Sequence, residues 1–215
     1  MSERARQIAL PLSAAMPGDA RRIVLGSANR AVAEALQSPD GWPFHTAVLA
    51  GPPRSGKSLF ARWFAGLGQG AGRGQAIDDA DRVDETELFH LWNRAQEAGR
   101  PLLLTRAAGP WDIRLPDLRS RMGAALQLSI APPDDTMLAE LIAEHAAARG
   151  VSMPEGASAY LVPRATRDYA AIEELVATID RLSLERKQPA TLAIWRDALD
   201  ILQGGDPEAD QPDLL

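Results

Sequence analysis

Residues 51–58 form a short glycine-bounded loop. The apolar segment before it has the pattern of a strand, and the apolar segment after it has the pattern of a helix. Their sequence, Gly-Pro-Pro-Arg-Ser-Gly-Lys-Ser, fits the phosphate-binding loop pattern of glycine, four residues, then glycine, lysine and serine. Residues 45–50 are short and largely apolar, as in a buried strand, and residues 59–65 have the apolar spacing of a helix. Strand, loop and helix are the context that this motif requires, so we predict a nucleotide-binding α/β domain. The alternative is a chance glycine-rich turn before a helix.

Each residue of the motif has a chemical reason to be there. Gly51 and Gly56 let the main chain approach a diphosphate closely, and main-chain N–H groups at the start of the following helix favour negative charge. Lys57 is expected to reach the β- and γ-phosphates, and the Ser58 hydroxyl to bind Mg²⁺. We also expect Arg54 and Ser55 of the loop, and Leu59 of the first helical turn, to contact the bound nucleotide.

Composition limits the partners of this chain. Its 215 residues are 46% hydrophobic, enough for an α/β core with a small second domain. A formal net charge of −6 disfavours strong direct binding to nucleic acid. The sequence has no cysteine and no apolar run near 18 residues, which excludes disulfides and argues against a membrane span. We expect a cytoplasmic protein without membrane contact.

Apolar runs alternate with helical patterns up to about residue 131, and helical patterns alone follow. Such alternation predicts a three-layer α/β/α core with a parallel sheet, followed by a small all-α lid. A first helix is expected from Ala20 to about Gln37, with a break near Gly26. The predicted regions are an N-terminal arm (1–17), the nucleotide-binding core (18–131), the lid (132–203) and a disordered acidic tail (204–215).

Two carboxylates follow the short segment Gln75–Ile77. If this segment is a strand, it delivers Asp78 and Asp79 to the sheet edge where a phosphate-loop protein holds Mg²⁺ and orients water. The alternative is an acidic turn, since Asp81 and Asp84 follow closely.

The N-terminal arm contains Gln7-Ile8-Ala9-Leu10-Pro11-Leu12. Its apolar side chains, with Pro11 keeping the chain extended, suit a peptide ligand for a partner's groove. An apolar tail that packs on its own domain is the alternative from the residues alone.

In this order, the motifs resemble the AAA+ family, and within it the DnaA branch and the Hda family of DnaA-homologous regulators. The resemblance covers roughly residues 7–203. It rests on the leading segment 23–29, the phosphate loop, Asp78-Asp79, the strand 101–105, the Leu-Arg-Ser-Arg segment 118–121 and the helical end of the chain. The chain lacks room for the DNA-binding and N-terminal domains of DnaA. The sheet should be one strand narrower than usual, because only the glycine-rich residues 66–74 stand where the family has a strand and a helix.

The resemblance implies a role for each of these segments. It places Ile23 and Val24 against the adenine of ADP or ATP, Asp78 near Mg²⁺, and Asp79 among the catalytic residues. It makes Arg121 an arginine finger acting in trans on DnaA-bound ATP, and Gln7, Leu10, Pro11 and Leu12 a motif for the DNA polymerase sliding clamp. The alternative for Arg121 is an ion pair with Asp117 or with the Asp134-Asp135 turn.

Two positions depart from the DnaA pattern. Ala107 replaces an aspartate after the first sensor threonine, and Glu173 stands where the lid arginine is expected, with Arg167 as a candidate substitute. We therefore expect nucleotide to be held more readily than it is hydrolysed. A self-sufficient ATPase or small-molecule kinase, a helicase or clamp-loader component, and a homo-oligomer stay open as alternatives.

Overall fold

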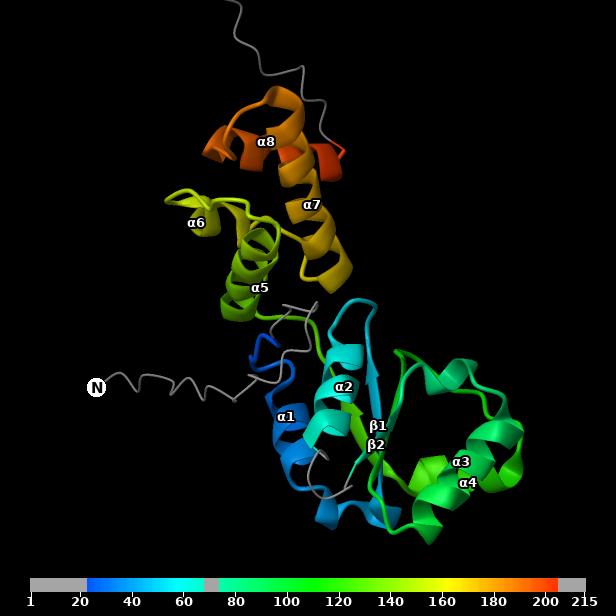
Figure 1. Cartoon of the computed structure of the whole chain (residues 1–215). Coiled ribbons are helices and arrows are strands. Elements are labelled where there is room, and N and C mark those ends of the chain that lie inside the picture. Colours follow the sequence, from blue (N-terminus) through cyan, green and yellow to red (C-terminus); the bar gives the residue numbers. More distant parts are fainter. Residues whose placement is uncertain (1–22, 68–73, 205–215) are drawn as a thin grey trace, which may run out of the picture.

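The computed structural model describes residues 23–67 and 74–204. Figure 1 shows an α/β core with a separate group of helices above it. In chain order the elements are α1 (Arg30–Gln37), the 3-10 turns Pro39–Gly41 and Pro43–His45, β1 (Thr46–Gly51), α2 (Lys57–Leu67), β2 (Gln75–Ile77), the 3-10 turn Ala80–Arg82, α3 (Glu85–Glu97), β3 (Leu102–Ala107), α4 (Pro116–Ala124), β4 (Leu126–Ser129), α5 (Asp135–Ala148), α6 (Ala157–Leu161), α7 (Tyr169–Arg186) and α8 (Leu192–Leu202).

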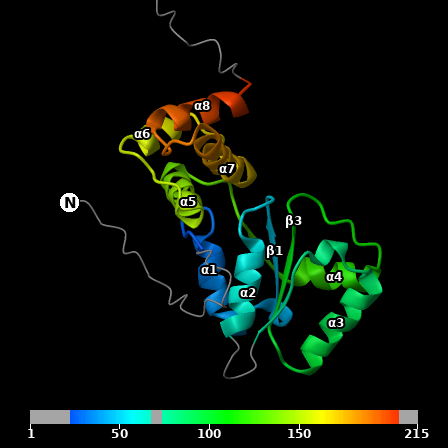
Figure 2. The same ribbon diagram turned by 45° about the horizontal axis from the view of Figure 1, so that its top comes forward.

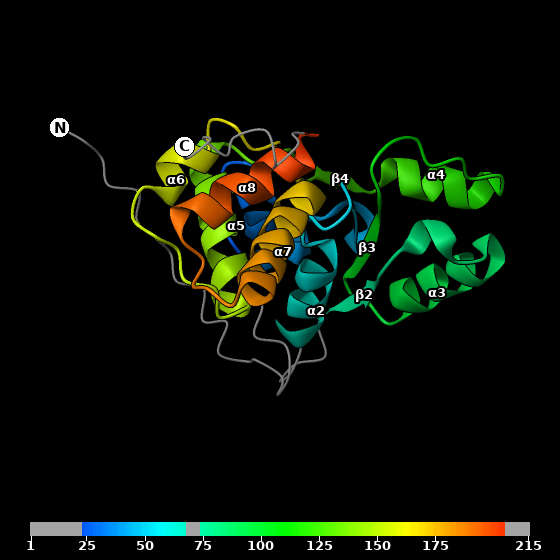
Figure 3. The same cartoon turned by 90° about the horizontal axis from the view of Figure 1, so that it is seen from above.

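The four strands of the described residues form one parallel sheet in the order β2-β3-β1-β4. Alternate side chains of the central strands enter opposite layers. Leu49 and Leu103 pack with Phe60 of α2, while Val48 and Leu104 join the cluster of α3 and α4. Helices α1 and α2 therefore cover one face of the sheet, and α3 and α4 cover the other (Figures 1 and 3).

The lid has its own apolar cluster. Helices α5 to α8 enclose Ile142, Val176, Ile179 and Trp195, all with at most 1% of their surface exposed. Asp134 and Asp168 accept hydrogen bonds from main-chain N–H groups in the first turns of α5 and α7, which fixes where these helices begin. Seen from above and from an oblique angle, α7 lies over the end of the core where α2 begins (Figures 2 and 3).

The predicted fold class is confirmed, but the predicted first helix is wrong over residues 23–25, and its expected start at Ala20 lies outside the described residues. Helix α1 begins at Arg30, and residues 23–26 are irregular. The Asn29 side chain explains this, because it donates to Val24 O and accepts from Gly26 N–H, replacing helical hydrogen bonds. The predicted arm and clamp motif lie outside the described residues, as does nearly all of the tail. Among the described residues no helix combines the length and apolarity needed to cross a membrane.

Candidate nucleotide-binding site

The phosphate loop connects the end of β1 to the start of α2. Arg54 and Gly56 have left-handed backbone conformations, with φ of 62° and 91°, so the chain curls around the space before α2. A Cβ on Gly51 would lie 2.9 Å from Ser55 Oγ and 3.2 Å from Ile130 Cβ, so any side chain at this position would be too close to these two neighbours. Ser55 Oγ is buried and has no hydrogen-bond partner among the described residues. A glycine-lined turn with an unpaired buried hydroxyl fits a phosphate group.

Lys57 lies at the centre of this loop. Its Nζ donates to Gly51 O at 2.9 Å and to Pro52 O at 2.8 Å. Burial lowers the pKa of Lys57, while the charges of Asp79, Asp78 and, least, Asp81 oppose that shift. The charges of these carboxylates therefore act on Lys57, and their joint role in a nucleotide site stays a prediction.

Thr105, in β3, holds the two carboxylate residues after β2 in different orientations. Its hydroxyl donates to Asp78 Oδ1 and accepts the Asp79 main-chain N–H at 3.0 Å. Asp79 has a left-handed backbone, with φ of 49°, and its side chain is 53% exposed. Asp78 is thus fixed against the sheet, whereas Asp79 is exposed at its carboxyl edge.

The described residues contain no group of three or more histidine, aspartate or glutamate side chains arranged for a metal ion. Magnesium bound with a nucleotide needs only one or two protein ligands beside phosphate and water. Ser58, in the first turn of α2, and Asp78, after β2, are residues with the right oxygen donors.

The leading segment 23–29 lies where core and lid meet. Ile23 and Val24 are half-buried and pack against the cluster of α1, α2 and Tyr169. A Cβ on Gly26 would lie 2.9 Å from Met137 of α5, so segment and lid are in close contact. This junction offers the apolar surface against which an adenine ring packs well.

Hydrogen bonds fasten the same junction. The Ser27 hydroxyl donates to Asp134, and the Tyr169 hydroxyl donates to Ala131 O at 2.8 Å. Hydrogen bonds from the main-chain N–H of Met137 and from the Ser27 hydroxyl lower the pKa of Asp134. The lid is therefore anchored to the core at the chain segment that connects them.

A second lid contact reaches the phosphate loop itself. Arg54 Nε and Nη2 each donate to Glu173 of α7, both at 2.5 Å. Arg149 Nη2, at the end of α5, lies 3.8 Å from Glu173 Oε1. Arg167, the predicted substitute, pairs instead with Asp135 at 2.7 Å. The sequence marked Glu173 as a departure but gave no sign of its partner, because the pair joins residues 119 apart.

Arg121 lies in α4, on the face of the sheet that α3 and α4 cover. Its guanidinium lies 4.4 Å from the Phe89 ring centre and 4.6 Å from that of Trp92, both in α3. Arg121 Nη1 is buried and has no hydrogen-bond partner among the described residues. The ion pair considered with the Asp134-Asp135 turn is absent among these residues, since Ser27 and Arg167 contact those aspartates. The aromatic contacts of Arg121 were not predicted.

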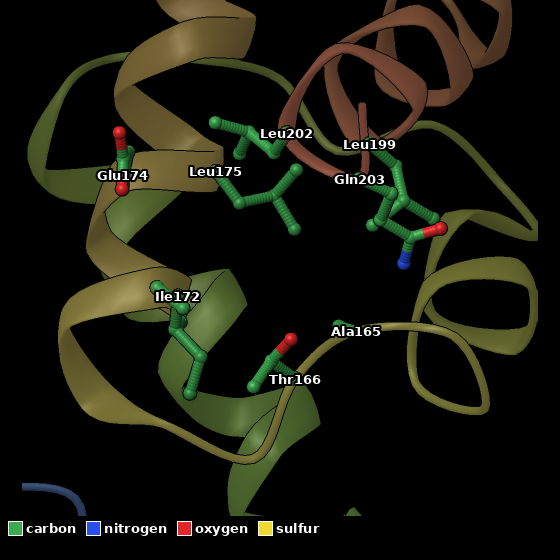
Figure 4. Close-up of a pocket in the computed structure, with 9 residues that line it drawn as sticks. Ala165, Thr166, Ile172, Glu174, Leu175, Leu199, Leu202 and Gln203 are labelled. Atoms are coloured by element: carbon green, nitrogen blue, oxygen red, sulfur yellow. The ribbon is translucent and has the colours of Figure 1, made fainter. Parts of the chain in front are cut away.

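The lid also has a hollow of its own between α7 and α8, with a volume of about 190 Å³. Figure 4 shows apolar side chains of both helices around it, with Glu174 and Gln203 among the lining residues. Neither the phosphate loop nor Glu173 lines this hollow. Glu173 and Glu174, which are adjacent in α7, thus have different neighbours: Glu173 contacts the phosphate loop and Glu174 lines the hollow.

Comparison with known proteins places these features in a fold class. The crystal structure of domain III of the Thermotoga maritima replication initiation protein DnaA matches with a TM-score of 0.67 and 14% identity, over 83% of this chain and 93% of that one. A replication initiator DnaA bound to AMPPCP and single-stranded DNA matches at 0.56 and 17%, over 76% and 66%. The Thermotoga maritima RuvB Holliday junction branch migration motor matches at 0.61 and 18%, over 87% and 74%. The chain therefore has the AAA+ fold.

The lid narrows this assignment. Residues 134–199 match the family model described as the Hda lid domain. The lid therefore resembles the Hda lid domain, and the core has the fold of DnaA domain III.

Proposed function

We propose that this chain is an adenine-nucleotide-binding regulator of chromosomal replication initiation that docks on the sliding clamp and promotes hydrolysis of DnaA-bound ATP. The observation that carries the proposal is that two features occur together in this chain. A phosphate loop, with the Lys57 ammonium held by the loop carbonyls of Gly51 and Pro52, lies beneath a lid whose sequence matches the Hda lid domain. DnaA, one homologue of which was solved with AMPPCP, is the partner that the shared fold suggests.

The core residues would hold ADP or ATP as follows. The amides of the loop and of the first turn of α2 would bind the phosphates, with Lys57 released from the carbonyls of Gly51 and Pro52 to reach them. Ser58 and Asp78 would hold Mg²⁺, which neutralises phosphate charge when bound. The half-buried Ile23 and Val24 would line the adenine side.

Arg121 would act on the nucleotide of a DnaA partner. A guanidinium supplied in trans offsets the charge that develops on a γ-phosphate and accelerates related reactions by about 10³- to 10⁵-fold. The rings of Phe89 and Trp92 would hold the Arg121 guanidinium between them in the free protein, so a partner has to draw this side chain outward before it can act. Asp79 is the exposed carboxylate that would assist water activation within this chain.

The experiment combines ATP-loaded DnaA, DNA-loaded sliding clamp and this protein with ADP, and follows phosphate release. Wild-type protein is expected to stimulate hydrolysis, and Arg121→Ala to lose at least about 100-fold of that stimulation while still binding clamp and nucleotide. Arg119→Ala is the matched control, because Arg119 lies on the same helix and its Nε donates to Ile113 O at 2.6 Å. Full stimulation by Arg121→Ala would remove the finger from this position.

The arm is tested separately with a chain that lacks residues 1–16. We expect this truncation, and the double change Leu10→Ala and Leu12→Ala, to abolish retention on immobilised clamp because these leucines supply the apolar anchors. Nucleotide binding should be unchanged, which controls for folding. Appreciable ATP turnover by the isolated chain, with no response to clamp or DnaA, would favour a self-sufficient ATPase or a RuvB-like motor component instead.

A further inference from the structure

The hollow between α7 and α8 adjoins a pair of arginines. The guanidinium carbons of Arg164 and Arg196 lie 4.3 Å and 4.9 Å from the centre of the same ring, that of Tyr160 in α6. Arg164 directly precedes Ala165, which lines the hollow. Gln203, another lining residue, donates from its side-chain amide to Arg164 O at 2.8 Å. The arginine pair and the hollow therefore form one continuous surface of the lid.

The positive charge of this arginine pair is not balanced within the described part of the lid. Elsewhere on the lid, Arg181 has a carboxylate partner, Glu185, at 3.2 Å. Arg164 and Arg196 are exposed, and no ion pair joins either of them to a carboxylate of residues 23–67 or 74–204. Like charges gathered at one ring repel each other, so an anion bound beside them would be stabilising.

The hollow next to the arginines accepts apolar groups. Leu199 and Leu202 of α8 line it, and Leu202 is 38% exposed. A cavity of about 150 Å³ holds a molecule the size of benzene, so a hollow of about 190 Å³ has room for an apolar side chain. Figure 4 shows Gln203 and Ala165 on one side of the hollow and Glu174 on the other. The surface therefore suits a segment with apolar side chains whose acidic residues lie on the arginine side.

The sequence directly after α8 has this composition. Residues 205–215 lie outside the described structure and contain four acidic residues, the last of which is followed by Leu214 and Leu215. The described chain stops at Gly204, next to Gln203 of the hollow. Nine residues, 205–213, can span up to roughly 30 Å, whereas α8, with 11 residues, is roughly 16 Å long. The two leucines are therefore within reach of the hollow.

We infer that the hollow and the arginine pair form a docking site for an acidic peptide with apolar side chains, and that residues 206–215 of this chain occupy it. Leu214 and Leu215 fill the hollow, and the acidic residues before them face Arg164 and Arg196. A segment tethered through a short connection has an effective concentration in the millimolar range, so even a weak contact is formed within one chain. The segment that the sequence alone marks as disordered is then held by the lid. The inference does not depend on the proposed nucleotide binding.

The test adds a fluorescently labelled synthetic peptide of residues 206–215 to the full chain and follows its anisotropy. In the wild type the site is already occupied, so the added peptide should bind weakly. The full chain with Leu214→Ala and Leu215→Ala has an open site and should bind the peptide at least about tenfold more tightly. Affinities within twofold of each other would overturn the inference. A dissociation constant above about 1 mM for the open chain would also overturn it, because the tethered segment could not then fill the site.

The contribution of the arginine pair is tested in the same open chain. Adding Arg196→Ala should weaken peptide binding by about threefold or more, because one of the two charges facing the acidic residues is lost. Arg181→Ala is the matched control, since it removes the same charge from an arginine that pairs with Glu185 on α7. An equal loss in the two variants would show that the peptide is attracted to the lid in general and would contradict the assigned site.

The contribution of the hollow is tested with a charge placed inside it. Adding Leu202→Asp to the open chain should abolish measurable peptide binding, because a carboxylate replaces an apolar lining residue. Leu184→Asp is the control, since Leu184 of α7 is 72% exposed and does not line the hollow. Peptide binding that survives Leu202→Asp in a folded protein would place the peptide elsewhere and overturn the inference.

Discussion

The sheet core and the helical lid contribute in different ways to the same loop. The core provides a cradle whose parts follow from short sequence segments: Gly51 at the end of β1, Lys57 at the start of α2, and the carboxylates directly after β2. The lid provides one acidic side chain, Glu173, that reaches the loop only through tertiary packing. The contrast shows that a local sequence motif forms the core part of the loop, whereas the lid contributes to the loop through a contact between residues that are distant in the sequence.

The largest effects on stability are expected from removing one large buried side chain from the apolar cluster of each region. Phe60→Ala in the core and Trp195→Ala in the lid each delete a side chain with 0% exposure. Each should lower the free energy of unfolding by about 3–5 kcal/mol, measured by urea denaturation. Because Met137 and Tyr169 of the lid also belong to the apolar cluster of the core, both variants should shift one common transition. Separate transitions for core and lid would show that the two regions are less coupled than we describe.

A smaller change closes the cradle and leaves the lid intact. In Gly51→Ala the new methyl group would meet Ser55 Oγ and Ile130 Cβ, so these neighbours have to shift. Overpacking of this kind costs about 1–3 kcal/mol, which corresponds to roughly a 5- to 150-fold loss of ADP affinity if the strain falls on the binding loop. Gly41→Ala is the control, since a Cβ there meets nothing within 4 Å. Equal affinity in Gly51→Ala and wild type would contradict the close approach of phosphate to this glycine.

The smallest effect on stability is expected from the hydrogen bond between Tyr169 of the lid and Ala131 of the core. Tyr169→Phe removes the hydrogen bond to Ala131 O and should lower the free energy of unfolding by about 1 kcal/mol. Tyr160→Phe is a suitable control, because the Tyr160 ring lies beneath Arg164 and Arg196 on the lid. A change below the error of urea denaturation would mean that this hydrogen bond does not secure the lid.

The same anchor predicts a dependence on pH. Burial, and then the charge of Asp134, raises the pKa of Tyr169 from 10.0 to about 12. The folded state therefore favours the neutral phenol, and its contribution is fully present below pH 10 and lost as the pH rises toward 12. The stability advantage of the wild type over Tyr169→Phe should shrink across that interval. An advantage that grows with pH would contradict the assigned cause.

The sequence predicted those parts of the fold and site that short segments determine. The phosphate-loop motif and its flanks predicted β1 and α2, and the glycine-rich residues before β2 predicted a narrow sheet. Residues 23–25 were wrongly predicted as helical because the Asn29 side chain replaces helical hydrogen bonds, an effect of local geometry that the hydrophobic period does not show. The surroundings of Glu173 and Arg121 could not be predicted, because each depends on how distant helices pack.

Titration of the wild-type protein with ADP and Mg²⁺, beside Lys57→Ala, tests the central claim most directly. We expect saturable one-site binding by the wild type and an affinity at least about 100-fold weaker in Lys57→Ala, because the variant loses the charge that the carbonyls of Gly51 and Pro52 hold at the loop. Equal binding by both folded proteins, or none by the wild type, would contradict the assignment of residues 51–58 as a nucleotide site.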